Sequence, residues 1–545
     1  MSSRATIPNL KYEHGTVVSY DPIASAMGSR VLLEGGNAVD AAIATGFALA
    51  VVYPQAGNLG GGGFMMIAPN DGNVEFLDYR ETAPRKLDAE RLITPASGLR
   101  APSVFGALSV GVPGTVAGFA EAHKRYGRLS WDRVIGVAID LAENGFRLTT
   151  RQAAYFSRYA QDLSYFDSTR HYFMSKGADY LPGSLIQQPH LTRCLRLLAD
   201  RGPEEFYEGS IAELIANEIE AGGGVLDLDD LRAYEAHWRN PITTRFLGKE
   251  VISSPFPSGG GMVIALTLRL LEASGIDAHP PGSLARYNLL GRCFRVAFSL
   301  RHRYAADPET LTPEDVEEIE NLFSMELKAG DLERFTETIV SQETAHAESL
   351  DKNTTHYCVL DAEGNGVSNT YSLNTLFGSK LAVSGAGFLL NNSIDDFRIG
   401  ENIPNWYGII DGPRNQLMPG RRPVGSMAPT IVRSSNRPAV ELLMGGSGGP
   451  TIPTLVTQAI VGTVIDGKSL HEALDAPRVH HQFQKAELCV EDMVPAEIRE
   501  QLFVGDPDPV RTVLRLGIGA GIERDPSTGR VVGALDKRFS HYAVL

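Results

Sequence analysis

The middle of the chain reads Thr354-Thr355-His356-Tyr357-Cys358-Val359-Leu360-Asp361, then Ala362-Glu363-Gly364-Asn365, then Gly366-Val367-Ser368-Asn369-Thr370-Tyr371-Ser372. The two outer runs are rich in β-branched and aromatic residues, and the short run between them carries Gly and Asn, which favour tight turns. This pattern predicts a β-hairpin. The preceding residues, 315 to 351, are polar and acidic, which indicates a solvated helix and a mobile linker. A strand therefore begins abruptly at Thr354.

Thr354 is a candidate nucleophile because of its place at this junction. A threonine hydroxyl inside a chain has no base beside it, whereas a threonine at a new chain start carries its own α-amine, with an ordinary pKa of about 7.7 to 8.0. Cleavage before Thr354 would therefore create the base. The alternative is that Thr354 and Thr355 are ordinary strand residues, because threonine favours β structure. The pattern alone leaves both interpretations open.

Helical and strand patterns flank the hairpin on both sides. Residues 23–52 predict two packed helices, and residues 64–67 and 74–78 predict strands joined by a turn at Asn70-Asp71-Gly72. Residues 115–240 are predominantly helical in pattern, which indicates helices that cover one face of a sheet. After the hairpin, residues 439–444 predict a strand that leads through a glycine-rich turn into a helix over 451–465.

The composition excludes several classes of partner. The 545 residues contain 65 acidic and 50 basic side chains, a formal net charge of -15, and no Lys/Arg-rich run, so nucleic acid is not an expected partner. The most apolar stretch, 38–53, is too short and too polar to span a bilayer, so no membrane association is predicted. The N-terminal residues lack the apolar segment of a secretory signal. The sequence as written predicts a cytoplasmic protein, and a periplasmic or secreted one if a leader was removed.

No cofactor or metal is predicted. Glycine clusters at 60–63, 259–261 and 445–449 lack the flanking residues of a P-loop or dinucleotide site, so they are tight turns or donors of an oxyanion hole. His480-His481 has no further ligands at zinc spacing. The four cysteines, which form no C-x-x-C pair and indicate neither a zinc knuckle nor a disulfide framework, are Cys194, Cys293, Cys358 and Cys489.

Several longer motifs run in order along nearly the whole chain. The first are Gly36-Asn37-Ala38-Val39-Asp40-Ala41-Ala42, Pro54-Gln55-Ala56-Gly57-Asn58-Leu59-Gly60-Gly61-Gly62-Gly63-Phe64-Met65, Asp78-Tyr79-Arg80-Glu81-Thr82-Ala83-Pro84 and Val112-Pro113-Gly114-Thr115-Val116-Ala117-Gly118. The later ones are Thr354-Thr355-His356-Tyr357, Leu390-Asn391-Asn392 with Asp395-Asp396-Phe397, Arg422-Pro423 with Ser426-Met427, and Ala476-Pro477-Arg478 with His480-His481-Gln482. Together they closely resemble the gamma-glutamyltransferases, also called gamma-glutamyltranspeptidases or glutathione hydrolases.

The resemblance implies an α/β (α+β) fold, the four-layer αββα sandwich of the N-terminal nucleophile hydrolases. It also implies a precursor that cuts itself between Asn353 and Thr354. The heavy subunit would be residues 1–353 and the light subunit residues 354–545, the two forming one αββα domain. Thr354 would then attack the γ-glutamyl amide of glutathione or a related compound, and water or the amine of an amino acid or peptide would take the acyl group. Neither metal nor cofactor takes part.

Residue roles follow from the same resemblance. The implied catalytic residues are the nucleophile Thr354, Thr355 and Ser372 beside it, and the backbone donors of an oxyanion hole, Gly448 and Gly449. The implied substrate contacts are Arg80 and Ser426 at the α-carboxylate, Asn374 and Asp396 at the α-ammonium, and Tyr407 in a lid loop over residues 401–421; Ser393 and Gly425 occupy two further substrate-binding positions.

Three positions near the implied site depart from the family pattern, as does Lys537 near the C-terminus, where a proline is frequent. Gly425 stands where a serine is usual, Ser393 where bacterial members commonly have glutamine, and Ser372 where a threonine is expected. A lost hydrogen bond to a charged substrate group costs about 1.5 to 3 kcal/mol, so Gly425 and Ser393 predict weaker γ-glutamyl binding. They keep open a related amidohydrolase that acts on another small amide or acyl substrate. A third alternative is a non-catalytic binding protein on the same scaffold.

Overall fold

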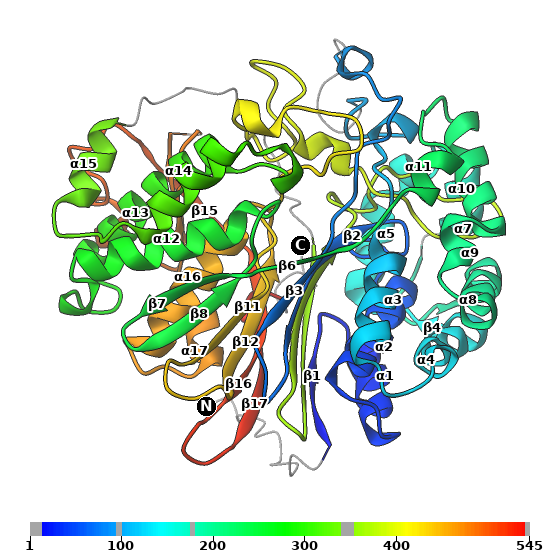
Figure 1. Cartoon of the computed structure of the whole chain (residues 1–545), viewed down its shortest axis with the longest axis horizontal. Coiled ribbons are helices and arrows are strands. Elements are labelled where there is room, and N and C mark those ends of the chain that lie inside the picture. The colour runs from blue at the N-terminus through cyan, green and yellow to red at the C-terminus, as the bar shows by residue number, and fades with distance from the viewer. Residues whose placement is uncertain (1–13, 94–100, 175–179, 339–353, 485, 540–545) are drawn as a thin grey trace.

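Two six-stranded sheets lie face to face in the middle of the molecule, and helices cover both outer faces (Figure 1). The computed structural model describes residues 14–93, 101–174, 180–338, 354–484 and 486–539. Figure 1 shows the two helical layers on opposite sides, with the N-terminal helices α1 to α4 on one and α12, α13 and α16 on the other. The layers are therefore helix, sheet, sheet, helix.

The first sheet contains the predicted hairpin at its centre. In spatial order its strands are β1 (Gly15–Val18), β9 (Thr355–Asp361), β10 (Gly366–Ser372), β2 (Gly62–Ala68), β3 (Glu75–Tyr79) and β6 (His237–Arg239). All neighbours are antiparallel, and the hairpin register pairs Thr355 with Tyr371. The β-hairpin expected from the sequence is confirmed, and its two strands are fully buried.

The second sheet carries the glycine-rich turn after the strand predicted at 439–444. In spatial order its strands are β17 (Val531–Leu535), β16 (Ile518–Arg524), β12 (Val440–Ser447), β11 (Thr430–Ser434), β8 (Lys249–Ser253) and β7 (Ile242–Phe246). The pairing of β12 with β16 sets Ser447 opposite Ile518. A third, small sheet contains β13 (Val479–His480), β14 (Leu488–Glu491) and β15 (Val510–Val513), and a two-stranded ribbon joins β4 (Phe146–Arg147) to β5 (Leu185–Ile186).

The helices divide between the two outer layers. Against the first sheet lies α2 (Ala38–Val52), a helix buried on every side and capped by Asn37 and Asp40. The others in this half are α1 (Pro22–Leu33), α3 (Thr115–Tyr126), α4 (Trp131–Asn144), α5 (Thr150–Arg158), α6 (Ala160–Leu163), α7 (Asp167–Phe173), α8 (Pro189–Arg201), α9 (Glu204–Tyr207), α10 (Ser210–Ala221) and α11 (Leu228–Arg232). Those of the other half are α12 (Gly259–Ala273), α13 (Leu284–Tyr304), α14 (Pro313–Ser324), α15 (Asp331–Thr338), α16 (Thr451–Val464), α17 (Leu470–Asp475) and α18 (Ala496–Arg499).

Two large hydrophobic clusters hold the layers together. One lies under the N-terminal helices and contains Tyr357 and Val359 of β9, whereas the other lies between the sheets, extends under α12, α13 and α16, and contains Cys358 and Leu360. Side chains of a strand alternate between its faces, so the same strand feeds both cores. Thr354 and His356 share the face of Cys358, which is the face toward the second sheet.

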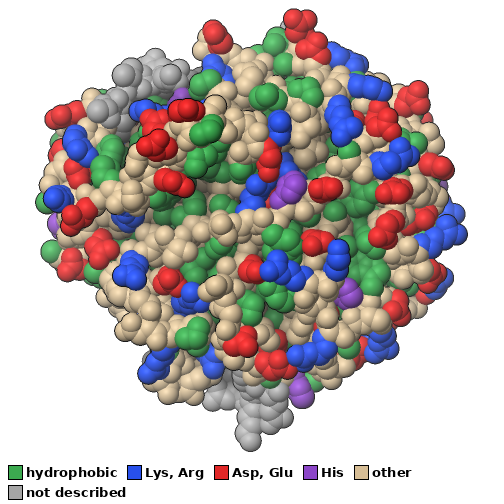
Figure 2. Space-filling model, viewed as in Figure 1, with side chains coloured by type: hydrophobic (Ala, Val, Ile, Leu, Met, Phe, Trp, Pro, Cys, Tyr) green, Lys and Arg blue, Asp and Glu red, His purple; other side chains and the backbone are tan. Residues whose placement is uncertain are grey.

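The acidic segment before the hairpin contains two helices, α14 and α15, where the sequence predicts one helix and a linker. The capping box of Thr312 and Asp315 starts α14. The remainder of the predicted linker lies outside the described residues. Within the described ranges, no helix combines the length and apolarity needed to cross a bilayer. Acidic and basic side chains are interspersed over the face drawn in Figure 2.

Candidate active site

A small cavity of about 30 Å³ lies where the hairpin, the glycine-rich turn and two long loops meet. Its walls are formed by Arg80, Arg301, Thr354, Ser372, Asn374, Asp396, Asn405, Tyr407, Ile409, Val424, Gly425, Ser426, Met427, Gly449 and Ile452. These residues come from segments far apart in the sequence. The fold thus brings most of the predicted site residues to one place.

The candidate nucleophile is held beside a second hydroxyl. Thr354 immediately precedes β9 and is 3% exposed. Its Oγ1 lies 3.3 Å from the Oγ of Ser372, at the end of the paired strand β10. The backbone N–H of Asn374 donates to the same Ser372 Oγ at 2.9 Å. Because that N–H uses a lone pair of the Ser372 oxygen, the Ser372 proton can be directed to Thr354.

Asn374 is fixed by its backbone and by the loop above it. Its φ of 75° is left-handed, a conformation that asparagine tolerates better than most residues. Its side-chain amide donates to the carbonyl of Asn392 at 3.1 Å, and its own carbonyl accepts from the Tyr407 hydroxyl at 2.9 Å. The loop that carries Tyr407 is therefore tied to Asn374, whose backbone N–H bonds the Ser372 hydroxyl beside the candidate nucleophile.

The glycine-rich turn joins β12 to α16 opposite Thr354. Gly448 and Gly449 have φ values of 134° and 56°, which other residues rarely adopt. A Cβ atom on Gly449 would lie 2.7 Å from Cε1 of Tyr407, so a side chain there would also clash with the ring. The turn opens the helix α16 (Thr451–Val464), whose N-terminus favours negative charge. This geometry suits a developing oxyanion.

A buried arginine forms the other wall of the cavity. Arg80, 1% exposed, donates from Nη1 to Glu81 Oε2 at 2.9 Å and to Ser393 Oγ at 3.3 Å, and from Nη2 to the carboxylate of Asp396. The Ser393 hydroxyl donates to Glu81 Oε1 at 2.8 Å. Two carboxylates therefore flank one guanidinium, a planar fork suited to binding a carboxylate in two places.

The acids around Arg80 have unusual protonation equilibria. Burial raises the pKa of Asp396 to about 6, although Arg80 acts against this shift. Burial also raises the pKa of Glu81. It raises the pKa of the neighbouring Asp395 to about 7, and Asp395 accepts from Ser103 Oγ at 2.8 Å and from the backbone N–H of Trp406 at 2.7 Å. Perturbed acids of this kind gather at functional sites more often than elsewhere.

Comparisons with known proteins agree with this geometry. The gamma-glutamyltranspeptidase family model matches residues 24–544. The glutathione hydrolase proenzyme of Escherichia coli (strain K12) is 36% identical over 485 residues, which cover 88% of this chain and 83% of that protein. This chain belongs to the gamma-glutamyltranspeptidase family.

Solved structures place the chain in the same fold class. A cephalosporin acylase from Bacillus halodurans superposes with a TM-score of 0.83 at 26% identity, covering 99% of this chain and 98% of that one. The gamma-glutamyltranspeptidase of Helicobacter pylori gives a TM-score of 0.55 at 35% identity over 62% of this chain and 94% of that chain. The fold of this gamma-glutamyltranspeptidase family member is the αββα sandwich of the N-terminal nucleophile hydrolases, as the resemblance implied.

Some predicted site residues do not line the cavity. Thr355 points to the opposite face of β9, where a Cβ on Gly57 would meet its methyl group at 2.8 Å. Ser393 is fully buried behind Arg80, as part of the arginine's own hydrogen bonding. Gly448 sits just behind Gly449. Asn353, half of the predicted cleavage site, lies outside the described residues.

Gly425, the departure at a usual serine, faces Arg80 with room to spare. A Cβ atom there would lie 3.6 Å from Phe64 Cε2 and 3.7 Å from Arg80 Nε, which are ordinary contact distances. The missing side chain is therefore not forced by packing. Ser426, next to it, lines the cavity.

Glu81, Asp395 and Arg301 were not among the predicted site residues. The motif containing Arg80 and Glu81 is visible in the sequence, but nothing local shows that Glu81 bonds Ser393, which follows 312 residues later. Arg301 of α13 (Leu284–Tyr304) lines the cavity and pairs with Asp411 at 2.5 Å, a contact between distant segments. Asp395 lies in the motif Asp395-Asp396-Phe397, but that motif gave it no role of its own.

Proposed function

We propose that the protein is a self-processing γ-glutamyl hydrolase and transferase that cleaves the γ-glutamyl amide of glutathione and related compounds. The observation that carries this proposal is the cavity in which Thr354 Oγ1 lies 3.3 Å from Ser372 Oγ, between the turn of Gly448 and Gly449 and the guanidinium of Arg80. A nucleophile, oxyanion donors and a carboxylate clamp are the parts that such a reaction needs.

The proposed maturation uses the Thr354 hydroxyl twice. It first attacks the carbonyl carbon of Asn353, the peptide C–N bond breaks, and the nitrogen takes up the proton as the free α-amine of Thr354. Water then hydrolyses the resulting ester. Residues 1–353 would become the heavy subunit and 354–545 the light subunit of one αββα domain. The relative in Escherichia coli is named a proenzyme, which supports a precursor of this kind.

In turnover the new α-amine serves as the base. It accepts the Thr354 hydroxyl proton while the oxygen attacks the γ-carbonyl, and it returns the proton to the departing amine. The negative charge that forms on the carbonyl oxygen faces the Gly448–Gly449 turn and the N-terminus of α16. The ester left on Thr354 is released by water or by an acceptor amine.

Recognition of the γ-glutamyl group would depend on the cavity wall formed by Arg80 and Asp396. The substrate α-carboxylate takes the place of Asp396 on the Arg80 fork, and the freed Asp396 carboxylate, with Asn374, receives the α-ammonium. The exchange keeps every buried charge paired, which matters because an unpaired buried charge is costly. Tyr407 and Ser426 would contact the same group, and the loop of Tyr407 would cover it.

Release of nitroaniline from L-γ-glutamyl-p-nitroanilide tests this function, with glycylglycine added to detect transfer. We expect release that saturates with donor and a ping-pong dependence on the acceptor. A purified protein that is cut before Thr354 but releases no nitroaniline would contradict the proposal.

A second candidate is an amidohydrolase of the same fold that acts on another small acyl group. Gly425 and Ser393 motivate this candidate, together with the TM-score of 0.83 for the superposition onto a cephalosporin acylase. The matched substrate is glutaryl-p-nitroanilide, which lacks only the α-amino group. A higher kcat/KM with the glutaryl than with the γ-glutamyl compound would favour this second candidate; the main proposal predicts the reverse. Turnover of either compound excludes a purely binding role.

A further inference from the structure

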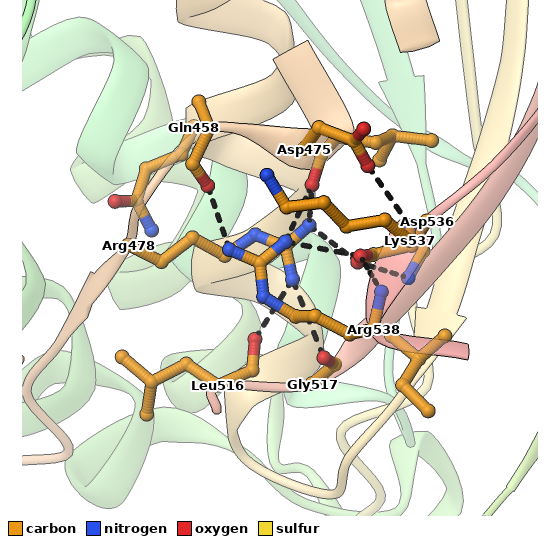
Figure 3. Close-up of polar contacts among 12 residues, drawn as sticks. Gln458, Asp475, Arg478, Leu516, Gly517, Asp536, Lys537 and Arg538 are labelled. Atoms are coloured by element: carbon orange, nitrogen blue, oxygen red, sulfur yellow. Dashed lines mark hydrogen bonds and ion pairs between the residues drawn. The ribbon is translucent and has the colours of Figure 1, made fainter. Parts of the chain in front are cut away.

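Four charged side chains lie together with almost no exposure behind the Gly448–Gly449 turn. They are Arg478, Glu491, Asp536 and Arg538, exposed by 1%, 0%, 1% and 4%. Figure 3 shows Arg478, Asp536 and Arg538 converging from two separate stretches of chain. We refer to these four residues as the buried ionic cluster. None of them lines the active-site cavity.

The cluster is internally neutral and closely bonded. Arg478 Nη2 donates to Asp536 Oδ2 at 2.6 Å, and Arg538 Nη1 donates to Asp536 Oδ1 at 3.0 Å. Arg538 Nε donates to Glu491 Oε1 at 2.8 Å, and the backbone N–H of Arg478 donates to Glu491 Oε2 at 2.9 Å. Burial alone would raise the pKa of Asp536, but the two arginines outweigh it and hold that pKa below its usual range. Two positive and two negative charges are thus mutually compensated.

The cluster forms hydrogen bonds with both carbonyl and amide groups of one short segment, residues 516–519. Arg478 Nη1 donates to the carbonyls of Leu516 at 3.0 Å and Gly517 at 3.3 Å (Figure 3). In the other direction, the N–H of Leu516 donates to Glu491 Oε1 at 2.8 Å. The N–H of Gly519 donates to Asp536 Oδ2 at 3.1 Å. Charge-assisted bonds of this kind are stronger than ordinary ones, so the segment has little freedom.

Residues 516–519 also pack directly against the glycine-rich turn. Gly519 and Ile518 pair in the second sheet with Gly446 and Ser447, the residues just before Gly448. A Cβ atom on Gly448 would lie 2.8 Å from the Cα of Gly517. The two backbones therefore lie in contact, with the Thr451 hydroxyl beside both of them and bonded to the Gly448 carbonyl at 2.8 Å, and a shift of Gly517 is transmitted to Gly448.

We propose that Arg478, with Glu491, Asp536 and Arg538, positions the oxyanion-binding turn by fixing residues 516–519 against Gly448. Arg478 is a positioning residue, since it reaches no substrate atom. This inference rests on the proposed function. Donors to an oxyanion act only if they sit within a few tenths of an ångström of the right place, and small displacements reduce the rate without altering ground-state binding.

The chain supplies a matched control in Arg286. It forms another buried pair, with Asp466 at 2.5 Å, and both arginines line the same separate cavity. No described contact joins Arg286 to residues 516–519. Arg286→Lys therefore measures how weakening a buried arginine–carboxylate pair changes kcat in general. Arg478→Lys measures the same effect plus the effect of displacing the Gly448–Gly449 turn.

The experiment measures kcat and KM for γ-glutamyl-p-nitroanilide on the cut forms of wild type, Arg478→Lys and Arg286→Lys. We expect Arg478→Lys to lose about 10-fold to 100-fold in kcat with KM within about 2-fold, and Arg286→Lys to keep kcat within about 2-fold. Equal losses of kcat in the two variants, an unchanged kcat in Arg478→Lys, or a loss confined to KM would overturn the proposal.

Asp536→Asn serves as the second variant if Arg478→Lys does not fold. Its side chain has the same shape and keeps an oxygen for the N–H of Gly519, yet removes the charge that holds Arg478. The same selective loss of kcat is expected, and its absence in folded protein contradicts the inference. Wild-type protein that is cut yet inactive would instead contradict the proposed function, so the two failures are distinguishable.

Discussion

The two walls of the proposed active site differ in the charge of their side chains. The nucleophile wall, with Thr354 and Ser372, contains no charged side chain and depends on backbone geometry. The carboxylate wall, with Arg80 and Asp396, is ionic and buried, and its one guanidinium pairs with the carboxylates of both Glu81 and Asp396. Substitutions in the first wall should therefore act on the chemical step, and substitutions in the second on binding and on its dependence on pH.

Replacement of the nucleophile should give the largest effect. Thr354→Ala is expected to abolish both cleavage of the chain and nitroaniline release, a loss of at least about 1,000-fold, because the proposed mechanism uses one hydroxyl for both reactions. Thr354→Ser keeps a hydroxyl and should retain part of each. The measurements are gel electrophoresis and the anilide assay. Appreciable turnover by Thr354→Ala would show that the neutral wall does not supply the nucleophile.

Weakening the guanidinium fork of Arg80 on the carboxylate wall should give the second largest effect. Arg80→Lys keeps the charge but loses the two parallel bonds, so we expect kcat/KM to fall by about 100-fold, mainly through KM. Arg433→Lys, which alters an arginine paired with Glu250 at 2.5 Å in the second sheet, is the control and should change little. If Arg80→Lys lowered kcat alone, the assignment of binding to this wall would be wrong.

The carboxylate wall should also determine the pH below which kcat/KM falls. Because burial raises the pKa of Asp396 to about 6, the carboxylate proposed to receive the ammonium is lost as pH falls through about 6, and kcat/KM should fall with it. The same titration changes the free energy of unfolding in the opposite direction with pH. A carboxyl whose folded pKa is raised favours folding below its unfolded pKa, and this contribution is lost as the pH rises toward 6.

Asp396→Asn separates these two effects. Thermal unfolding of wild type and variant across the range from about pH 4 to pH 6 should show a smaller loss of stability with rising pH in the variant. The profile of kcat/KM with pH, recorded on wild type, checks the activity limb. Parallel stability profiles in the two proteins would argue against Asp396 as the titrating group.

The smallest change is expected at the departure from the family pattern. Gly425→Ser places a hydroxyl beside Arg80 where a Cβ meets nothing closer than 3.6 Å, so it should fold normally. One added hydrogen bond to the substrate carboxylate would lower KM by up to about 10-fold with kcat nearly constant. An unchanged or higher KM would mean that the charged wall already satisfies its ligand.

Local pattern predicted the neutral wall better than the charged one. The hairpin at Thr354 and the strand and helix around Gly448 follow from residue type and turn chemistry within a few positions. The bonds of Arg80 to Ser393 and Asp396 join residues more than 300 positions apart, and only the fold shows them. The resemblance to a family supplied Arg80 and Asp396, but not Glu81. The small sheet of β13 to β15 was also missed, because strands of two to four residues carry little periodicity.

The state of the peptide bond before Thr354 tests the central claim most directly. Intact-mass spectrometry and N-terminal sequencing of fully active protein should show two chains, with the second starting at Thr354, and no uncut chain of 59.0 kDa. A single uncut chain that turns over γ-glutamyl-p-nitroanilide at the full rate would contradict it, because Thr354 would then have no α-amine to act as its base.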